Sequence, residues 1–413
     1  MEERTLAPSE QLKIAMLSIH SCPLAKLGGK DTGGMNVYIR ELARELGRQG
    51  HTVDVYTRTH DPLDDQIVEL SKSARLIHLE AGEAEDIHKL AVYPHLAEFA
   101  CNLESFRKHN GLEYDLIHSH YWLSGWVGRW IQGWWDVAHI IMFHTQGAVK
   151  NAIGVGEDDP DLRIQTEREL AKNCHCIIAA TEKEKEELIQ YYHASPERIG
   201  VIPCGVNLEL FQRVDKELAR RQLGFNDGKI LLFVGRIEPL KGIDNLLVAM
   251  THLRRRLAVR LVVVGGDDHS QSEMERLHML SQKLDIQDSV TFAGTVMQEE
   301  LPRYYSAADV CVIPSYYESF GLVALESLAC GTPIVATKVG GIDSIIDQGE
   351  TGYSVNDNAP FHLADRIAAL LSKPNTGAKA TRSIRSTVAR FSWANIAEAM
   401  IQQYQAVLRH YLA

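Results

Sequence analysis

Short apolar runs rich in β-branched residues alternate with amphipathic helical patterns along most of the chain. Strands that are apolar throughout, alternating with helices at this spacing, favour a parallel sheet covered by helices on both faces. Right-handed crossovers then give a doubly wound sheet. The strand patterns of the first half are KIAMLSIH, TVDVYTR, ARLIHLE, YDLIHSH, HIIMFHT and CIIAAT, and those of the second half are KILLFVGR, VRLVVVGG, SVTFAG, DVCVIPS, TPIVATK and GYSV.

The series of strands is interrupted near VIPCGVNLELF (residues 201–211) and resumes at KILLFVGR after a polar helical pattern. A chain of 413 residues fits two domains of about 200 residues each. We therefore predict two Rossmann-like α/β domains, 1–205 and 206–390, facing a central cleft at the carboxyl ends of their sheets. The remaining segment, 391–413, carries a long amphipathic helical pattern with no strand after it.

Charge and cysteine usage narrow the function classes. The formal net charge of -11 argues against a general nucleic-acid binder. Seven cysteines are scattered, several of them inside apolar strand patterns, which is typical of reduced, buried thiols in a cytoplasmic protein. The polar N-terminal segment has no signal-peptide core, and no apolar run reaches membrane-spanning length. We predict a soluble, cytoplasmic protein.

Two cations follow a strand pattern of the second half. In VGRIEPLKGID, Arg236 stands at the end of the strand pattern and Lys241 follows one short loop later. Two cations at the carboxyl edge of a sheet suit an anion such as a diphosphate. The alternative is a solvated loop with ordinary surface charges.

Two carboxylates follow another strand pattern, in SYYESFGLVALESLACG. Glu318 lies in the loop before a predicted helix, and Glu326 lies eight residues later within it. Eight residues make a little over two helical turns, so the carboxylates point to similar sides. Such acceptors can hold sugar hydroxyls, while the N–H groups of a helix N-terminus hold phosphate. The alternative for Glu326 is a carboxylate on a helix face.

Histidines end two strand patterns of the first half. His118 and His120 point to one face of a strand, but no further ligand cluster follows, which favours a structural or substrate-contacting role over a metal. His144 ends the pattern HIIMFHT, where it can donate to a sugar hydroxyl or act as a base. The alternative is a hydrogen-bonded histidine of the cleft wall.

Taken together, the Arg–Lys pair, the E-x7-E pair and a following Gly340–Gly341, in this order on a second doubly wound domain, resemble one enzyme family. These are the retaining, nucleotide-sugar-dependent glycosyltransferases of family GT4, with the GT-B fold, and the resemblance covers essentially the whole chain. It implies that Arg236 and Lys241 hold the donor's diphosphate and stabilise charge as UDP leaves. It also implies that Glu318 contacts the donor sugar's hydroxyls, that Glu326 contacts the ribose, and that residues 391–413 cross back onto the N-terminal domain.

Within this family, SIHSCPLAKLGGKDTGGMNVY, HSHYWLSG and HTQGAVKN are similar to the D-inositol 3-phosphate glycosyltransferases, which move N-acetylglucosamine from its UDP donor. The resemblance implies that the acceptor's phosphate is held by Lys89, Tyr121, Thr145 and Arg163. It places His144 near the donor, so that the implied catalytic residues are His144, Arg236, Lys241 and Glu318. The implied sites further include His20, Asp31, Thr32, Gly33 and Asn36 for the acceptor, and Gly34 and Val296 for the donor.

The paired glycines of DTGGMNVYIREL are interpreted in the same terms. Gly33 and Gly34 let the loop close over the donor's phosphate and sugar, with the helix N-terminus contributing N–H groups. A tight turn between a strand and a helix is the alternative, and it explains one glycine better than two.

Cofactors and assembly follow from the resemblance as well. The chemistry itself requires no cofactor. In the subgroup, Mg²⁺ has been placed on backbone oxygens of a turn near a threonine, and the matching positions here are Tyr305, Ser306, Ala308 and Thr332. A homodimer is left open.

The chain also departs from the subgroup's pattern at Gln146, Gly147 and Val296. These departures leave open whether the donor is UDP-N-acetylglucosamine or UDP-glucose, and whether the acceptor is inositol 3-phosphate. Sucrose-phosphate synthases are close relatives that use fructose 6-phosphate, although Met35 and Asn36 favour inositol phosphate.

No carboxylate is placed as a nucleophile, which favours front-face displacement. A UDP-sugar epimerase needs no second-substrate pocket, and a non-catalytic binding protein needs no complete donor site, so the residue set counts against both.

Overall fold

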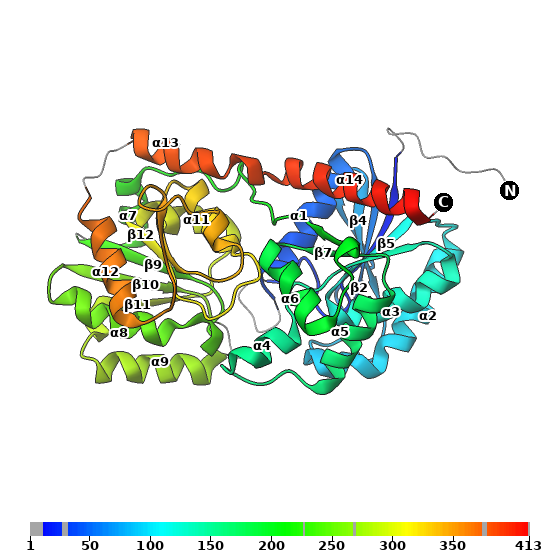
Figure 1. Ribbon diagram of the computed structural model, residues 1–413, viewed down its shortest axis with the longest axis horizontal. Helices are drawn as coiled ribbons and strands as arrows, with labels where there is room; N and C mark the ends of the chain where they lie inside the picture. Colours follow the sequence, from blue (N-terminus) through cyan, green and yellow to red (C-terminus); the bar gives the residue numbers. More distant parts are fainter. Residues whose placement is uncertain (1–10, 27–31, 226–227, 267–269, 374–377, 412–413) are drawn as a thin grey trace.

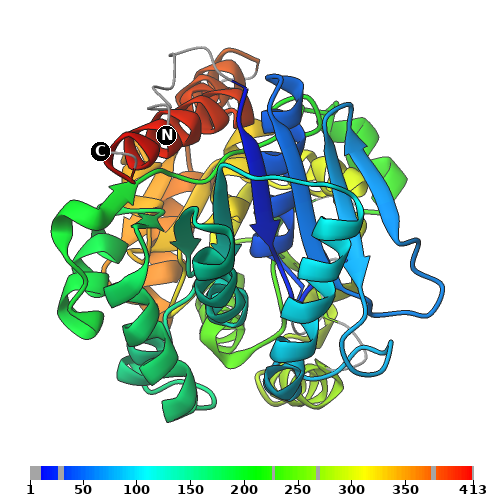
Figure 2. The same cartoon turned by 90° about the vertical axis from the view of Figure 1, so that its right-hand side faces the viewer.

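The structure, a computed structural model, describes residues 11–26, 32–225, 228–266, 270–373 and 378–411 (Figure 1). Asp31, one of the predicted acceptor residues, lies outside these ranges. Two α/β domains lie side by side, each built on a sheet with helices on both faces (Figures 1 and 2). The predicted fold class, two doubly wound Rossmann-like domains, is confirmed.

The sheet of the first domain has the strand order β3-β4-β2-β1-β5-β6-β7-β8. Strand β3 pairs antiparallel with β4, and the other pairings are parallel. The order reverses between β1 and β5, so the carboxyl ends of these two strands flank the usual ligand position. The strands are β1 (Lys13–Leu17), β2 (Thr52–Arg58), β3 (Ile67–Ser71), β4 (Ala74–Leu79), β5 (Leu116–His120), β6 (Ala138–Met142), β7 (Cys176–Ala179) and β8 (Ile199–Val201). The helices are α1 (Gly34–Arg48), η1 (Lys89–His95), α2 (Leu96–His109), α3 (Tyr121–Trp135), α4 (Gly147–Ile153), α5 (Asp161–Asn173), α6 (Glu182–Tyr192) and η2 (Pro196–Arg198).

The sheet of the second domain has the parallel strand order β11-β10-β9-β12-β13-β14, and its order reverses between β9 and β12. The second ligand position therefore lies at the ends of β9 and β12. The strands are β9 (Lys229–Val234), β10 (Val259–Val264), β11 (Val290–Gly294), β12 (Val310–Ile313), β13 (Ile334–Thr337) and β14 (Gly352–Val355). The helices are α7 (Lys216–Leu223), η3 (Pro239–Lys241), α8 (Ile243–Arg254), α9 (Gln271–Lys283), η5 (Gln287–Ser289), η6 (Gln298–Glu300), α10 (Leu301–Ala307), α11 (Leu322–Ala329), η7 (Ile342–Ser344), α12 (Pro360–Leu371) and α13 (Ala378–Thr387).

The C-terminal segment, with η8 (Ala389–Phe391) and α14 (Trp393–Tyr411), joins the two domains along one side (Figures 1 and 2). Helix α14 packs against α1 and β6 of the first domain. The Trp393 ring lies edge-on to Tyr38 with centroids 5.4 Å apart, and the Tyr404 hydroxyl lies 2.6 Å from His118 Nδ1. Apolar residues of α14 belong to one buried cluster that contains core residues of both domains.

Trp393 gives this arrangement an energetic test. The Trp393→Ala variant should lose about 3–5 kcal/mol of unfolding free energy, the usual cost of truncating a buried tryptophan. Trp393 is buried, and it packs so closely on Gly205 that a Cβ at that glycine would lie 2.5 Å from the indole. Urea denaturation measures the loss. The control Phe361→Ala removes an exposed ring and should stay within about 0.5 kcal/mol; equal losses in the two variants would contradict the packing argument.

Candidate active site

The two predicted cations lie at the end of β9, where the second sheet reverses its strand order. Lys241 Nζ donates to Glu318 Oε1 at 2.7 Å, and Ser315 Oγ donates to the same oxygen at 2.7 Å. The Arg236 guanidinium forms an ion pair with Glu238 at 2.9 Å. The Lys241 side chain is only 16% exposed, so it is part of an ordered cluster and not a solvated surface charge. Lys241 and Glu318 are thus brought together from the ends of two adjacent strands.

Two glycines allow the loops of this cluster to pack together. Gly242 has a left-handed φ of 63°, and a Cβ there would lie 2.2 Å from the Pro314 carbonyl oxygen. Gly340 has a φ of 56°, and a Cβ there would lie 2.3 Å from the Glu318 carbonyl oxygen. Such distances exclude any side chain. The glycine after Lys241 and the first glycine of the later pair therefore position the Glu318 loop.

The paired glycines before α1 lie directly against the second domain. A Cβ on Gly34 would lie 3.2 Å from Leu322 Cδ1, and a Cβ on Gly33 would lie 3.9 Å from Arg236 Cδ and Nε. The bare backbone of this loop thus faces the first turn of α11 and the cation at the end of β9. Both glycines therefore approach the second domain, and a tight turn between a strand and a helix would not require this of both.

Asn36 and Thr32 shape the same loop. The Asn36 amide is fully buried; its Nδ2 donates to Ser21 Oγ at 2.7 Å and to the Cys22 carbonyl at 2.8 Å, while Oδ1 accepts from Gly33 N at 2.9 Å. Thr32 Oγ1 donates to the Lys26 carbonyl at 2.8 Å. Both donor hydrogens of Asn36 are therefore engaged within the first domain. A role of Asn36 toward an acceptor stays a prediction, and its visible role is to hold the glycine loop.

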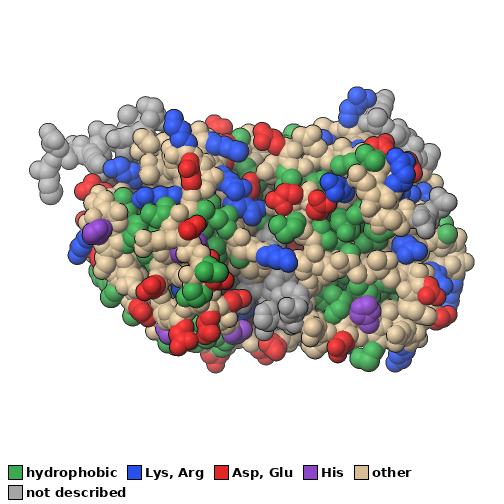
Figure 3. All heavy atoms as spheres, turned by 180° about the vertical axis from the view of Figure 1, so that it is seen from behind, with side chains coloured by type: hydrophobic (Ala, Val, Ile, Leu, Met, Phe, Trp, Pro, Cys, Tyr) green, Lys and Arg blue, Asp and Glu red, His purple; other side chains and the backbone are tan. Residues whose placement is uncertain are grey.

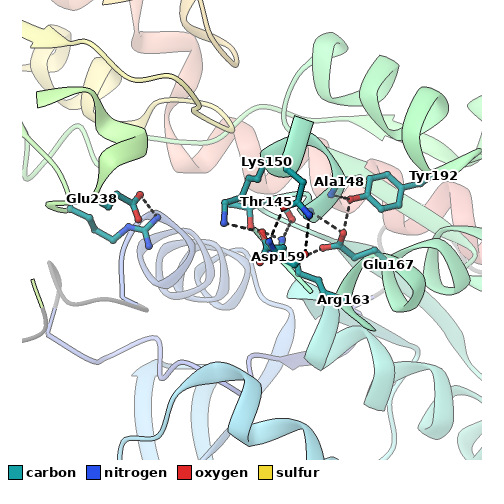
Figure 4. Close-up of polar contacts among 11 residues, drawn as sticks. Thr145, Ala148, Lys150, Asp159, Arg163, Glu167, Tyr192 and Glu238 are labelled. Atoms are coloured by element: carbon teal, nitrogen blue, oxygen red, sulfur yellow. Dashed lines mark hydrogen bonds and ion pairs between the residues drawn. The ribbon is translucent and has the colours of Figure 1, made fainter. Parts of the chain in front are cut away.

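A buried ionic cluster occupies the first-domain side of the cleft (Figure 4). Arg163 of α5 is 1% exposed; its Nε donates to Glu167 Oε1 at 2.7 Å and its Nη1 to Asp159 Oδ1 at 2.8 Å. Its Nη2 donates to the carbonyl of Thr145 at 2.7 Å and to Thr145 Oγ1 at 3.0 Å. Lys150 of α4 donates to Asp159 Oδ2 at 2.9 Å. Burial opposes the charge of Arg163, yet Glu167 and Asp159 keep its pKa raised, so it is a permanent cation.

Tyr121 and His20 complete this side at the ends of β5 and β1. The Arg163 guanidinium lies 4.8 Å from the Tyr121 ring centroid, in cation–π geometry. The His20 and Tyr121 rings are 4.3 Å apart, and Tyr121 has a left-handed φ of 75° that turns its ring into the cleft wall. Lys89, the first residue of η1, is close enough to lower the pKa of Tyr121 against the larger, raising effect of burial. The structure therefore gathers Lys89, Tyr121, Thr145 and Arg163, as the resemblance implies.

Three members of the cluster were absent from the sequence prediction: Lys150, Asp159 and Glu167. Lys150 carried a usable signal, because it lies one helical turn beyond the strand end that presents Thr145. The two carboxylates carried none, since a buried ion pair and a surface carboxylate look alike in sequence.

Cations from both domains act electrostatically on one carboxylate, that of Glu238. Burial raises the pKa of Glu238, but Arg236, Lys241, Lys150 and Lys89 together hold it below its usual value. Two of these cations belong to the second domain and two to the first. Figure 4 shows Glu238 on one side of the cleft and Lys150 on the other. A cavity of ≈ 200 Å³ lies between the domains, lined by α4 and α6 on one side and by residues 316–319 on the other.

A row of buried histidines lies at the ends of β5 and β6. His144 Nε2 and His120 Nδ1 share a hydrogen bond of 2.9 Å, and His118 Nδ1 shares one of 2.6 Å with the Tyr404 hydroxyl. Burial, followed by the proximity of His20, lowers the pKa of His144 to about 3. His144 is therefore neutral near pH 7. It can hydrogen-bond to a hydroxyl, but it does not act as a general acid. Within the described ranges, no group of three or more His, Cys, Asp or Glu side chains has the arrangement of metal ligands.

Glu326 and Val296 lie deeper in the second domain. Glu326 Oε2 accepts from the Tyr305 hydroxyl at 2.7 Å, and the Gln298 side chain hydrogen-bonds to the same carboxylate. Burial raises the pKa of Glu326 to about 7. Val296 is partly buried against the core in the loop between β11 and η6. The carboxylate is therefore poised between its charged and neutral forms.

The residues implied for Mg²⁺ form a neutral set. Thr332 Oγ1 donates to the Tyr305 carbonyl at 2.6 Å, and Ser306 Oγ accepts from Val214 N at 3.0 Å. The Ala308 amide donates to the carbonyls of Tyr304 and Tyr305. The Thr332 and Ser306 hydroxyls and the Tyr305 carbonyl are thus engaged in protein hydrogen bonds, and no carboxylate belongs to the set. The magnesium site stays a prediction, and no step is derived through it.

The surface, the helices and the cysteines add three general observations. On the face in Figure 3, acidic and basic side chains are interspersed. Over the part of the chain that the structure describes, no helix combines the length and apolar character needed to cross a membrane. All seven cysteines are free; Cys101 is exposed and the other six are buried.

Comparisons with known proteins agree with this geometry. A model described as glycosyl transferases group 1 matches residues 215–387, and one described as glycosyltransferase family 4 matches residues 32–210. The chain is 39% identical over 404 residues to a D-inositol 3-phosphate glycosyltransferase of Corynebacterium diphtheriae, covering 95% of this chain and 94% of that protein. It is 40% identical over 402 residues to D-inositol 3-phosphate glycosyltransferase 2 of Catenulispora acidiphila, with 95% and 94% covered.

Among solved structures, sucrose-phosphate synthase from Thermosynechococcus elongatus matches with a TM-score of 0.88 at 36% identity, covering 97% of this chain and 100% of that chain. Anabaena HepE in complex with UDP and glucose matches with a TM-score of 0.75 at 18% identity, with 95% and 99% covered. The second likeness, at 18% identity, concerns the fold alone.

Proposed function

The chain belongs to the glycosyltransferases of family 4, with the GT-B fold, and from that premise we propose that it moves a hexosyl group from a UDP-sugar to a phosphorylated polyol or sugar. The donor is UDP-N-acetylglucosamine or UDP-glucose, and the anomeric configuration is retained. The observation that carries the proposal is a pair of cationic groups on the two sides of the cleft, Arg236 and Lys241 at the end of β9 and Arg163 with Lys150 in the first domain. Two cationic groups facing each other suit two anions, the donor's diphosphate and the acceptor's phosphate.

On the donor side, Arg236 and Lys241 bind the diphosphate and take up the charge that develops as UDP leaves. Lys241 donates to Glu318 at 2.7 Å, and this contact positions the carboxylate to accept a hydrogen bond from a hydroxyl of the donor sugar. Gly33 and Gly34 admit the donor's phosphate and sugar between α1 and α11. Glu326 accepts hydrogen bonds from the ribose hydroxyls, and the backbone around Val296 lies beside the uracil base of the donor.

On the acceptor side, Arg163, Lys150, Lys89 and Thr145 bind the phosphate, and Tyr121 and His20 form the wall beside it. Inositol 3-phosphate is the leading acceptor, because two relatives of 39% and 40% identity carry that substrate in their names. Fructose 6-phosphate is the second candidate, because the sucrose-phosphate synthase fold matches with a TM-score of 0.88. Both acceptors present one phosphate and several hydroxyls.

The mechanism proposed is a front-face displacement. Glu318, the carboxylate proposed to contact the donor sugar, is hydrogen-bonded to Lys241 and Ser315, so it serves to orient hydroxyls and not as a nucleophile. The acceptor hydroxyl attacks the anomeric carbon as the C–O bond to UDP breaks, and the departing phosphate oxygen takes the acceptor's proton. Neutral His144 hydrogen-bonds to a hydroxyl of the transferred sugar. Contact between the domains excludes water and limits hydrolysis of the donor.

A matrix of UDP- and ADP-sugars against inositol 3-phosphate and fructose 6-phosphate, followed by release of the nucleotide, tests the proposal. Release of UDP that requires the acceptor is expected for one donor and acceptor pair, and the product's anomeric configuration is then determined by NMR. Conversion of the UDP-sugar to its epimer without acceptor would indicate an epimerase. Absence of turnover with both phosphorylated acceptors would refute the proposed acceptor class.

Binding of the UDP-sugar should depend on pH through Glu326. Its pKa is raised to about 7, and the ionised form accepts the ribose hydroxyls, so affinity is present above that value and is lost as the pH falls below it. Between about pH 8 and about pH 6 the affinity for UDP-glucose should fall about tenfold. Isothermal titration calorimetry measures this, and Glu326→Gln, which cannot ionise, should bind with a flat profile. An equally steep profile in that variant would assign the titration to another group.

A further inference from the structure

A line of polar side chains links the first domain to Glu326. Arg40, on α1, donates from Nη2 to Gln298 Oε1 of η6. Gln298 in turn hydrogen-bonds to the Glu326 carboxylate of α11. Gln298 and Glu326 are each 7% exposed, and the Arg40 side chain is 13% exposed, so the link is shielded from water. Such shielding makes each hydrogen bond worth more than at the surface.

The orientation of the Gln298 amide follows from its two partners. Arg40 is a donor without an acceptor, and an ionised carboxylate is an acceptor without a donor. The amide oxygen therefore faces Arg40 and the amide nitrogen faces Glu326. This orientation gives the carboxylate an N–H donor, and hydrogen bonds donated to a carboxylate favour its ionised form.

Helix α1 contacts the donor side at a second point, which makes the link part of a larger interface. The glycine loop at the start of α1 approaches Leu322, the first residue of α11, and Glu326 lies four residues further on. Positions four residues apart share one face of a helix. The N-terminal turn of α1 thus approaches this face of α11 directly, and the middle of α1 is linked to it through Gln298.

We propose that Arg40 and Gln298 are positioning residues that hold the Glu326 carboxylate ionised and oriented toward the donor's ribose, so that donor binding depends on contact of α1 with α11. The inference rests on the proposed function, in that Glu326 binds the ribose. It adds a role for two residues that touch no predicted substrate atom. The domain that binds the acceptor thereby controls the donor site of the other domain.

The charge of Glu326 is sensitive to this link because burial works against it. Burial raises its pKa, and the hydrogen bonds from Tyr305 and Gln298, followed by the charge of Arg40, lower it. Glu326 in turn acts on the thiols of Cys311 and Cys330, which are neutral near pH 7 because burial, followed among the raising effects by the Glu326 charge, raises the pKa of each. Loss of Arg40 removes the cation that offsets the burial.

Calorimetric titration with UDP tests the inference. The variants Arg40→Met and Gln298→Leu should each bind UDP roughly tenfold more weakly than the wild type, the effect of losing one hydrogen bond to a charged group. The double variant should bind no more weakly than either single one, because both changes break the same link. With UDP-glucose, Arg40→Met should also move the midpoint of the pH profile upward.

Arg44→Met is the matched control. Arg44 lies on the same helix and contacts the same Glu41 carboxylate as Arg40, both at 3.1 Å, but it makes no contact with Gln298. Its UDP affinity and pH profile should equal those of the wild type. Equal affinities for Arg40→Met and Arg44→Met would overturn the inference, as would additive losses in the double variant. A wild-type protein that does not bind UDP would instead refute the proposed function. If Arg40→Met does not fold, Gln298→Leu tests the link from the other domain.

Discussion

Lys241→Ala should lower kcat by about 10³-fold, the scale of losing one preorganised group that stabilises charge in the transition state. The side chain is 16% exposed and held by Glu318 at 2.7 Å, so its ammonium group is fixed before the substrate arrives. Charge develops on the diphosphate as the bond to the sugar breaks, and a fixed cation stabilises that charge more than it stabilises the bound donor. The loss should therefore appear mainly in kcat and less in the KM for the donor.

Steady-state kinetics with the best donor and acceptor pair measures this loss. Lys338→Ala is the control, because Lys338 lies in the same domain, is 56% exposed and pairs with Asp343 at the surface. Its kcat should be unchanged. A kcat within tenfold of the wild type for Lys241→Ala would show that the lysine does not stabilise the departing UDP.

Arg163→Met should cost about 3–5 kcal/mol of unfolding free energy, because it leaves buried charges without their partner. Arg163 is 1% exposed and binds Asp159 and Glu167 at 2.8 and 2.7 Å. Lys150 still neutralises Asp159, but Glu167 keeps only the Tyr192 hydroxyl and the Gly147 amide as donors. Those neutral donors do not replace a buried cation. Folded variant protein should also lose most of its affinity for the phosphorylated acceptor.

Urea denaturation gives the free energy, with Arg168→Met as the control. Arg168 lies on the same helix and is exposed, so its loss should stay within about 0.5 kcal/mol. Lys150→Met separates binding from stability, since Lys150 is at the edge of the cluster with a side chain that is 19% exposed. It should raise the acceptor KM and leave the donor KM unchanged. A stable Arg163→Met variant with an unchanged acceptor KM would contradict both roles of the cluster.

The sequence predicted well that candidate residues which follow strands lie together, whereas their donor and acceptor roles stay predictions. Arg236 follows β9 and Glu318 follows β12, while His20 follows β1 and Tyr121 follows β5. The carboxyl ends of parallel strands meet at one edge, so residues at strand ends converge even when they are far apart in the chain. Strand β3 was not predicted, because its side chains are mostly exposed or half-buried and its sequence contains no apolar run.

Contacts that depend on how two elements or two domains face each other could not be predicted. Arg40 and Gln298 are separated by 258 positions in the chain, and neither residue belongs to a motif. Lys150, Asp159 and Arg163 form a cluster because α4 and α5 face each other, which local patterns do not encode. Asn36 illustrates the same limit, because no local pattern predicts that its amide donates to Ser21 and Cys22 and so holds the glycine loop.

The central claim is that the cluster around Arg163 selects an acceptor for its phosphate. The most direct measurement compares kcat/KM for inositol 3-phosphate with that for inositol, and for fructose 6-phosphate with that for fructose, by following release of UDP. The account predicts that the phosphate raises kcat/KM by about 10³-fold for the true acceptor, as expected for several charge-assisted hydrogen bonds. Equal kcat/KM values with and without the phosphate would contradict it.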